Sequence, residues 1–311
     1  TKLSNNFVKI LNKMKIEGGD FSKLQSGMLV ATFFSLWLAV YFGNAIEEVF
    51  GYILILSFGI LHGANDIKLL QVTAASRSKP LTFVRILIYY VVFVLGVAAL
   101  FYMIPAISLA LFILFSAYHF GEQHWISKIT SSSWLIFFFY TAYGLIVLLL
   151  LFTAHDEEVS SIVLSITGLW IPPFYYPMAL GVTSIIYVAQ YVLLFKQIKA
   201  KIILELFYLM VFFIIFNTAS LLWAFTIFFI IWHAIPSLAD QIQFLYGDIS
   251  KSNFFRYIRS SAVYWGISVV ALVLLFIFIE DTGAGFLPFL FSFLAAITFP
   301  HVLVINRLNA S

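Results

Sequence analysis

Residues 202–235 read IILELFYLMVFFIIFNTASLLWAFTIFFIIWHAI, an almost continuous apolar run that breaks only at Asn217-Thr218 and closes on His233. A helix needs about 20 residues to cross a bilayer, so the run is long enough for nearly two crossings. The break at the Asn-Thr pair predicts two consecutive membrane helices, the second of which carries a histidine near its end.

The same pattern extends over the whole chain, which is 63% hydrophobic and only 10% charged, with a mean hydropathy of +1.04. These values exclude an ordinary soluble domain. We predict an all-α fold, a polytopic integral membrane helical bundle of about ten transmembrane helices. The predicted spans lie near 27–43, 50–70, 84–103, 105–121, 133–152, 176–196, 202–216, 219–235, 258–279 and 285–303.

The charges predict the topology. With ten spans, all 17 Lys and Arg residues fall on one side of the membrane. The loops of the other side carry only acids, namely Glu47, Glu48, Asp156, Glu157, Glu158, Glu280 and Asp281. The positive-inside rule then places both termini in the cytoplasm. The expected location is the inner (cytoplasmic) membrane, which the chain crosses several times. Because the net charge of +3 comes from membrane-flanking residues, it gives no reason to expect a nucleic-acid partner.

We predict two parts, a basic amphipathic segment over 1–26 and a single transmembrane catalytic domain over 27–305. The first lacks the apolar core of a signal peptide. Its apolar residues recur at helical spacing between lysines, which favours a helix on the cytoplasmic membrane surface. A disordered basic tail is the alternative.

Four histidines close apolar runs at the predicted cytoplasmic side, namely His62, His119, His233 and His301. An imidazole in hydrocarbon is unfavourable unless it is paired or bound. The four helices run in the same direction, so their imidazoles can converge on a metal ion. Taken singly, a buried histidine is more often a hydrogen-bonded structural residue than a metal ligand. His155, in the acidic outer loop, is expected to be solvated and is set aside.

His124 follows His119 by five residues, which is about 140° around an ideal helix. Both can bind one ion only if Gly121 breaks the helix. Otherwise His124 is an interfacial residue or a partner of a ligand.

The chemistry of such a cluster is that of a nitrogen-ligated metal. The chain has no cysteine, so thiolate ligands are excluded, and neutral imidazole suits zinc, copper and iron. A ligating histidine usually donates its other ring N–H to a carboxylate. Three of the histidines are followed by an acid at or near helical spacing, at Asp66, Glu122 and Asp240. We expect these acids to support the ligands, although Pro236 should bend or end the helix before Asp240.

Four motifs in order carry a resemblance to a known family: LHGANDIKLL at 61–70, SAYHFGEQHW at 116–125, WHAIPSLADQ at 232–241 and FPHVLVINR at 299–307. Over roughly 50–305 the chain resembles the bacterial Brp/Blh family of β-carotene 15,15′-dioxygenases. The resemblance implies a membrane enzyme that uses non-haem Fe(2+) and O2 to split the central double bond of β-carotene into two retinals. The partners implied are membrane lipid and a rhodopsin that receives the retinal.

The resemblance also implies that His62, His119 and His233 bind the iron. Many members carry a further histidine four residues after the WH pair, where this chain has Ser237. Serine is a poor iron ligand, so the fourth place passes to His301, which we prefer, or to His124. A second departure, Leu61 in place of proline, should have little consequence.

Aromatic residues make up 19% of the chain, and most should face lipid or form interfacial belts. Beside the motifs, Tyr118, Tyr191 and Trp232 are candidates for lining the path of the polyene.

Three other classes of protein compete with this interpretation. A di-iron hydroxylase or desaturase would need HxxxH and HxxHH boxes, and the six histidines here form none. A haem carrier with two axial histidines would show a Soret band. A metal or proton transporter often shows inverted repeats, and the sequence has no internal repeat.

Overall fold

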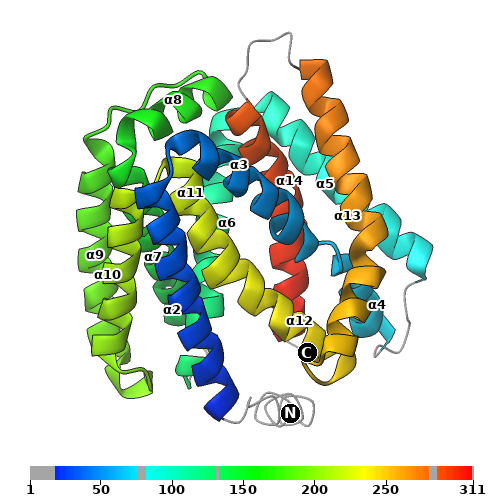
Figure 1. Cartoon of the computed structure of the whole chain (residues 1–311), viewed down its shortest axis with the longest axis horizontal. Helices are drawn as coiled ribbons and strands as arrows, with labels where there is room; N and C mark the ends of the chain where they lie inside the picture. Colours follow the sequence, from blue (N-terminus) through cyan, green and yellow to red (C-terminus); the bar gives the residue numbers. More distant parts are fainter. Residues whose placement is uncertain (1–17, 76–81, 131–132, 280–285, 310–311) are drawn as a thin grey trace. The chain divides into compact units, whose positions relative to one another are not determined.

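The computed structural model describes residues 18–75, 82–130, 133–279 and 286–309, and it is built of helices (Figure 1). Among these residues eight helical segments are long and apolar enough to cross a membrane, judged by length and composition. They confirm the predicted polytopic helical membrane fold. The segments are α2 (Gly18–Tyr41), α5 (Phe83–Met103), α6 (Pro105–Trp125), α7 (Trp134–Ala154), α9 (Tyr175–Leu194), α13 (Lys251–Ile279), α14 (Phe286–Asn309) and the continuous run from Leu221 to Tyr246.

The two remaining predicted spans differ from a long straight helix. The span predicted over 202–216 is a shorter apolar helix, α10 (Ile202–Thr218), which ends at the Asn-Thr break. The span predicted over 50–70 is made of α3 (Asn44–Leu54), the π-helix η1 (Ile55–Gly59) and α4 (Asp66–Ala75), with a turn before α4. Hydropathy alone does not reveal such an interruption, because the turn residues lie inside an apolar run.

The continuous run from Leu221 to Tyr246 changes its helix type along its length. It begins as α11 (Leu221–Thr226), becomes the π-helix η4 (Ile227–Ala234) and continues as α12 (Ile235–Tyr246), which has Pro236 in its first turn. A proline is tolerated there because the first residues of a helix donate no internal hydrogen bond. The predicted end of the helix at Pro236 is therefore wrong: the helix continues to Tyr246, and only the change from π to α geometry falls near the proline.

One helix was not predicted. The acidic loop after α7 forms α8 (Asp156–Thr167), which ends at Gly168 with a positive φ of 73°. Glycine adopts this left-handed conformation without strain and commonly ends helices. The loop histidine His155 caps the junction of α7 and α8 and is half-buried.

Most of the predicted N-terminal surface helix, residues 1–17, lies outside the described residues. Residues 18–26 are the start of α2.

The chain divides into two compact units, and the predicted single domain over 27–305 stays a prediction. Unit 1 comprises Thr1–Phe93, Thr226–Val270 and Leu303–Ser311, and unit 2 comprises Val94–Phe225 and Ala271–Val302.

In unit 1 the π-helices η1 and η4 pack against each other, and α2 packs beside η4. A buried cluster of Leu238, Ile242 and Tyr257 joins α12 to the first half of α13, with Leu61 packed against it. The turn after η1 is thereby enclosed by α12 and α13.

In unit 2, α6 and α9 pack on α7, α10 packs on the same helix, and α8 lies across one end (Figure 1). Two glycines determine the close approach of α6 and α7. A Cβ on Gly121 would collide with the Tyr140 carbonyl, and a Cβ on Gly144 would collide with the Ala117 carbonyl. Small residues that let helix backbones touch are a common basis of helix association in membranes.

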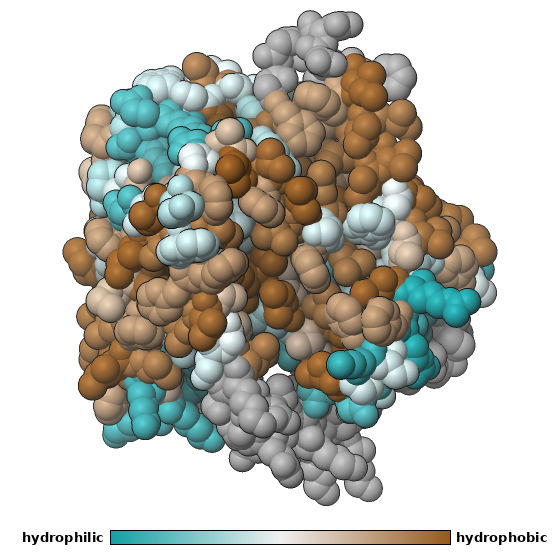
Figure 2. Space-filling view, viewed as in Figure 1, coloured by the Kyte–Doolittle hydropathy of each residue, from teal (hydrophilic) through white to brown (hydrophobic). Residues whose placement is uncertain are grey.

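In unit 2 the basic loops lie at one end of the helices, where Glu205 also lies, and the acidic helix α8 lies at the other end, while the predicted orientation in the membrane stays a prediction. The basic loops after α6 and α9 meet, because Ile129 and Ile198 form an antiparallel bridge and the Lys199 amide donates to the Lys128 carbonyl at 2.8 Å. The acids Asp156, Glu157 and Glu158 lie on α8. In Figure 2 the surface over α9 and α10 is brown in the middle and teal toward both ends.

Candidate functional site

Unit 1 brings two of the four predicted histidines together. His62 lies at the turn after η1, and His233 lies in η4. Both are buried, and their ring centroids are 5.3 Å apart with the planes at 88°. Phe229, one turn before His233, stacks on its ring at 5.6 Å and meets the His62 ring edge-on at 5.5 Å. The two imidazoles therefore share one buried, aromatic environment.

Both of these histidines are positioned by π-helical segments. A π-helix inserts an extra residue into a helical turn, and such insertions often occur at functional sites. Gly59, the last residue of η1, allows η4 to approach, because a Cβ there would lie 2.9 Å from Phe229 Cε1. The π-helices thus turn His62 and His233 toward one another where a regular helix would rotate them differently.

The tautomer of His62 follows from its main-chain contact. Its Nδ1 lies 2.5 Å from the Gly59 carbonyl oxygen. A carbonyl only accepts, so Nδ1 carries the proton and the lone pair is on Nε2. A backbone carbonyl is one of the usual partners of a metal-ligating histidine. His62 is therefore prepared to bind a metal through Nε2.

Unit 2 holds the second pair. His119 on α6 and His301 on α14 are buried, with ring centroids 5.4 Å apart and planes at 84°. One turn earlier on α6, Phe115 packs against Phe299 at 5.1 Å. Pro300 lies inside α14 directly before His301, and it removes one helical hydrogen bond. The register of α14 on α6 sets the distance between the two histidines.

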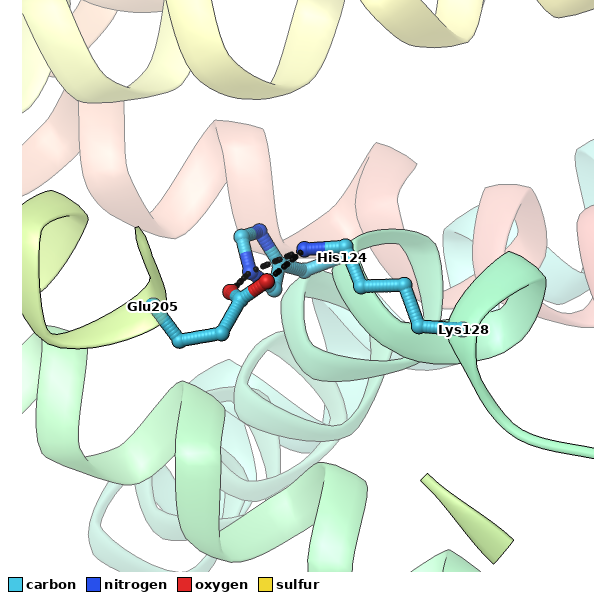
Figure 3. Close-up of polar contacts among 3 residues, drawn as sticks. All are labelled: His124, Lys128 and Glu205. Carbon is cyan, nitrogen blue, oxygen red and sulfur yellow. Dashed lines mark hydrogen bonds and ion pairs between the residues drawn. The ribbon is translucent and has the colours of Figure 1, made fainter. Parts of the chain in front are cut away.

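His124 has different neighbours. Because α6 continues through Gly121 to Trp125, His124 stays on another side of the helix from His119. Its Nε2 lies 2.5 Å from Glu205 on α10, and Lys128 donates to the same carboxylate at 2.7 Å (Figure 3). The ring stacks on Tyr143 at 4.5 Å. His124 belongs to a buried ion cluster that joins α6 to α10.

Sequence reasoning did not single out Glu205. The available signal was a lone carboxylate within an apolar span, and Glu205 is buried. A buried charge needs partners, but helical spacing could not find them, because His124 lies on α6 and Lys128 in the short turn after it.

The three predicted supporting acids have distinct surroundings. Asp66 is fully buried at the start of α4 and accepts a hydrogen bond from Tyr90 at 2.9 Å. Glu122 is buried on α6 and accepts one from Tyr118 at 2.9 Å. Asp240 is exposed on α12, whereas His233 is buried. Asp66 and Glu122 thus accept hydrogen bonds from tyrosines, and the His62 ring N–H is directed at the Gly59 carbonyl. A role in supporting a ligand stays a prediction for all three acids.

The three aromatic candidates are held by their own contacts. Tyr118 stacks on Phe137 at 4.6 Å, Tyr191 meets Phe195 edge-on at 6.3 Å, and the Trp232 indole donates to Thr32 of α2 at 3.0 Å. A role in lining a polyene path stays a prediction for all three. Ser237, at the position of the expected extra histidine, is buried and accepts a hydrogen bond from Gln241 at 3.2 Å.

Each histidine pair fits a metal ion by its spacing. Two imidazoles on one ion, with metal–nitrogen distances of about 2.1 Å and bonds roughly 110° apart, have ring centroids about 5 Å apart. The observed values of 5.3 and 5.4 Å agree with that geometry. Within either unit, the described residues bring no group of three or more ligating side chains together. Each pair alone therefore supplies two ligands.

Comparison with known proteins gives the family. The family model described as β-carotene 15,15′-dioxygenase matches residues 53–309. No curated protein and no solved structure matches the chain. The matched region includes both histidine pairs and all four motifs, and it covers most of the chain. The chain therefore belongs to the β-carotene 15,15′-dioxygenase family, whose members are carotenoid-cleaving enzymes.

Proposed function

We propose that this membrane enzyme uses non-haem Fe(2+) and O2 to cleave β-carotene at its central double bond, giving two molecules of all-trans-retinal. The observation that carries the proposal is the pairing of four buried histidines, two by two, at spacings that suit a metal ion. The donor set is nitrogen-rich and lacks thiolates, which suits iron in oxygen chemistry.

The proposed iron ligands are His62, His119, His233 and His301. This assignment of all four to one ion rests on their common predicted depth and on the resemblance in sequence. Within unit 1 it is supported by the His62 tautomer, which leaves Nε2 as the donor atom. Within unit 2 it is supported by the burial of His301 beside His119. His301 supplies the imidazole that Ser237 lacks.

The reaction balances without an external reductant. The central C=C bond and the O–O bond break, and each former alkene carbon receives one oxygen atom as an aldehyde. When bound, ferrous iron supplies open coordination positions and the electrons that activate O2. The protein holds the His62 imidazole in one tautomer and keeps the surroundings apolar, since Phe229 packs against both the His62 and His233 rings.

Substrate and product are both apolar, so we propose that they exchange through the lipid of the inner (cytoplasmic) membrane. The helices α5, α9 and α13 expose most of their apolar side chains, as expected for helices that face lipid. The retinal formed would pass within the same membrane to a rhodopsin.

The test is expression of the chain in a bacterium that makes β-carotene. We expect loss of orange colour and two equivalents of retinal per carotene consumed, measured by chromatography. Cleavage under 18O2 should label both aldehydes. A His62→Ala variant that inserts at the same level should leave the pigment intact, and His155→Ala should cleave normally. Unchanged pigment with inserted wild-type protein, or eccentric apocarotenal products, would reject the proposal.

A further inference from the structure

The turn after His62 changes the main-chain hydrogen bond that a continuous helix would form at this position. In a continuous helix the Asp66 amide would donate to the His62 carbonyl, but here it donates to the Gly63 carbonyl at 3.2 Å. A buried carbonyl without a donor destabilises a fold by about 1–3 kcal/mol. A donor to the His62 carbonyl from elsewhere in unit 1 would therefore stabilise the interrupted span.

Two side chains from other helices contact the His62 carbonyl oxygen. Gln241 of α12 donates its Nε2–H to the His62 carbonyl at 2.8 Å, and the Tyr257 hydroxyl of α13 lies 3.2 Å from the same oxygen. Tyr257 also donates to Gln241 Oε1 at the shorter distance of 2.7 Å. That bond fixes the orientation of the amide and directs Nε2 at His62. Both side chains are buried.

The surrounding contacts make this arrangement rigid. Asn65, in the turn, donates to the Tyr257 carbonyl at 3.2 Å and accepts from Ser260 at 2.9 Å. Gln241 also donates to Ser237 at 3.2 Å. Buried polar networks with satisfied members tend to specify one conformation. The turn is thereby tied to α12 and α13 on both sides of His62.

We propose that Gln241 and Tyr257 are positioning residues that orient His62 for metal binding through its main-chain carbonyl. The proposal rests on the proposed function, in which His62 binds iron. His62 is held at two points, its ring by the Gly59 carbonyl and its backbone by Gln241. Loss of the backbone contact frees the turn to rotate, and the imidazole then leaves its position beside His233.

The experiment measures metal affinity rather than activity. Wild type, Gln241→Glu, Tyr257→Phe and His62→Ala are purified in detergent without metal and titrated anaerobically with Fe(2+) or Co(2+) against a chelator. Gln241→Glu keeps the shape but replaces the donor with an acceptor, and Tyr257→Phe removes one hydroxyl. Tyr246→Phe is the matched control, because that hydroxyl contacts Lys68 and Ser260 in the same unit and not His62.

We expect Gln241→Glu and Tyr257→Phe to weaken metal binding by about 10–100-fold, the range seen when partners of metal ligands are removed. Their Co(2+) absorption spectra should shift, whereas Tyr246→Phe should match wild type in both measurements. A purely structural role would lower the melting temperature of the metal-free protein and leave affinity and spectrum unchanged, and that result would overturn the proposal. Tyr257→Phe, the smaller change, decides the matter if Gln241→Glu does not fold.

The two proposals fail in different ways. If His62→Ala loses metal while Gln241→Glu and Tyr257→Phe bind it as wild type does, the positioning role is wrong and the iron site stands. If His62→Ala binds metal as tightly as wild type, the assignment of His62 as a ligand is itself wrong.

Discussion

His62 and His233 face one another across two packed π-helices, with ring centroids 5.3 Å apart and planes at 88°. His119 and His301 repeat this arrangement in unit 2 at 5.4 Å and 84°. Two nearly perpendicular imidazoles at this distance can each direct a ring nitrogen at one ion. The shared geometry of the two pairs is the basis of the predictions on metal content and on ligand identity.

Metal analysis of the purified protein should find about one iron per chain. Four histidines are enough for one ion and too few for the two ions of a di-iron enzyme. Inductively coupled plasma measurement on anaerobically purified protein tests the number, and chelation should abolish cleavage until Fe(2+) is restored. Two irons per chain, or zinc at full occupancy with cleavage retained, would contradict the single-iron shell.

Alanine at His62, His119 or His233 should abolish cleavage while the protein still inserts, because each change removes a polar group from an apolar span. His155→Ala should cleave at the wild-type rate, since His155 lies at the junction of α7 and α8. Retinal formation, normalised to membrane-inserted protein, is the measurement. An inactive His155 variant beside an active His233 variant would refute the predicted topology of the site.

If the two acids support the ligands, Asp66→Asn and Glu122→Gln should lower metal affinity or activity by about 10–100-fold, because an amide keeps the size of the acid but loses its negative charge. The hydroxyls of Tyr90 and Tyr118 can still donate to the amide oxygens, so the fold should persist. Wild-type iron content and turnover in both variants would show that the two acids serve only these tyrosines.

Gly121→Ala and Gly144→Ala should destabilise unit 2 by about 1–3 kcal/mol or prevent folding, as overpacking does in a tight core. In both variants the new Cβ meets the backbone of the opposite helix, which has no soft rotamer to yield. Gly96→Ala and Gly181→Ala are matched controls, because a Cβ at these helical positions meets nothing within 4 Å. Thermal unfolding in detergent should separate the two sets, and equal melting temperatures would mean that α6 and α7 are not in backbone contact.

The features that could be predicted from the sequence are those that depend only on residues close together in the chain. Apolar runs gave the membrane helices, and the histidines at their ends gave the candidate ligands, because both depend on neighbouring residues. The π-helices η1 and η4 were not predicted, since an extra residue per turn leaves hydropathy unchanged. Gln241 and Tyr257 were missed because their role depends on the His62 carbonyl, a main-chain atom that every residue possesses. Glu205 was missed because its partners, His124 and Lys128, lie far away in the chain.

The last prediction concerns the fourth ligand. His301→Ala should lose iron, because His301 lies beside His119 in the same buried pair. His124→Ala should keep iron, because the His124 ring is bonded to Glu205 and stacked on Tyr143. Removing it should instead lower stability, since Glu205 would retain only Lys128. Iron content and melting temperature, measured on the same samples, distinguish the two effects.

A complementary experiment adds a histidine instead of removing one: Ser237→His is introduced into the His301→Ala variant. The substitution restores an imidazole at the position where the resemblance places one, so partial recovery of iron would mean that positions 237 and 301 serve the same ion. Ser237→His in an otherwise wild-type chain is the control for damage to the Gln241 contact. Iron retained in His301→Ala and lost in His124→Ala would identify His124 as the fourth ligand, and the ion cluster with Glu205 would then have to open when metal binds.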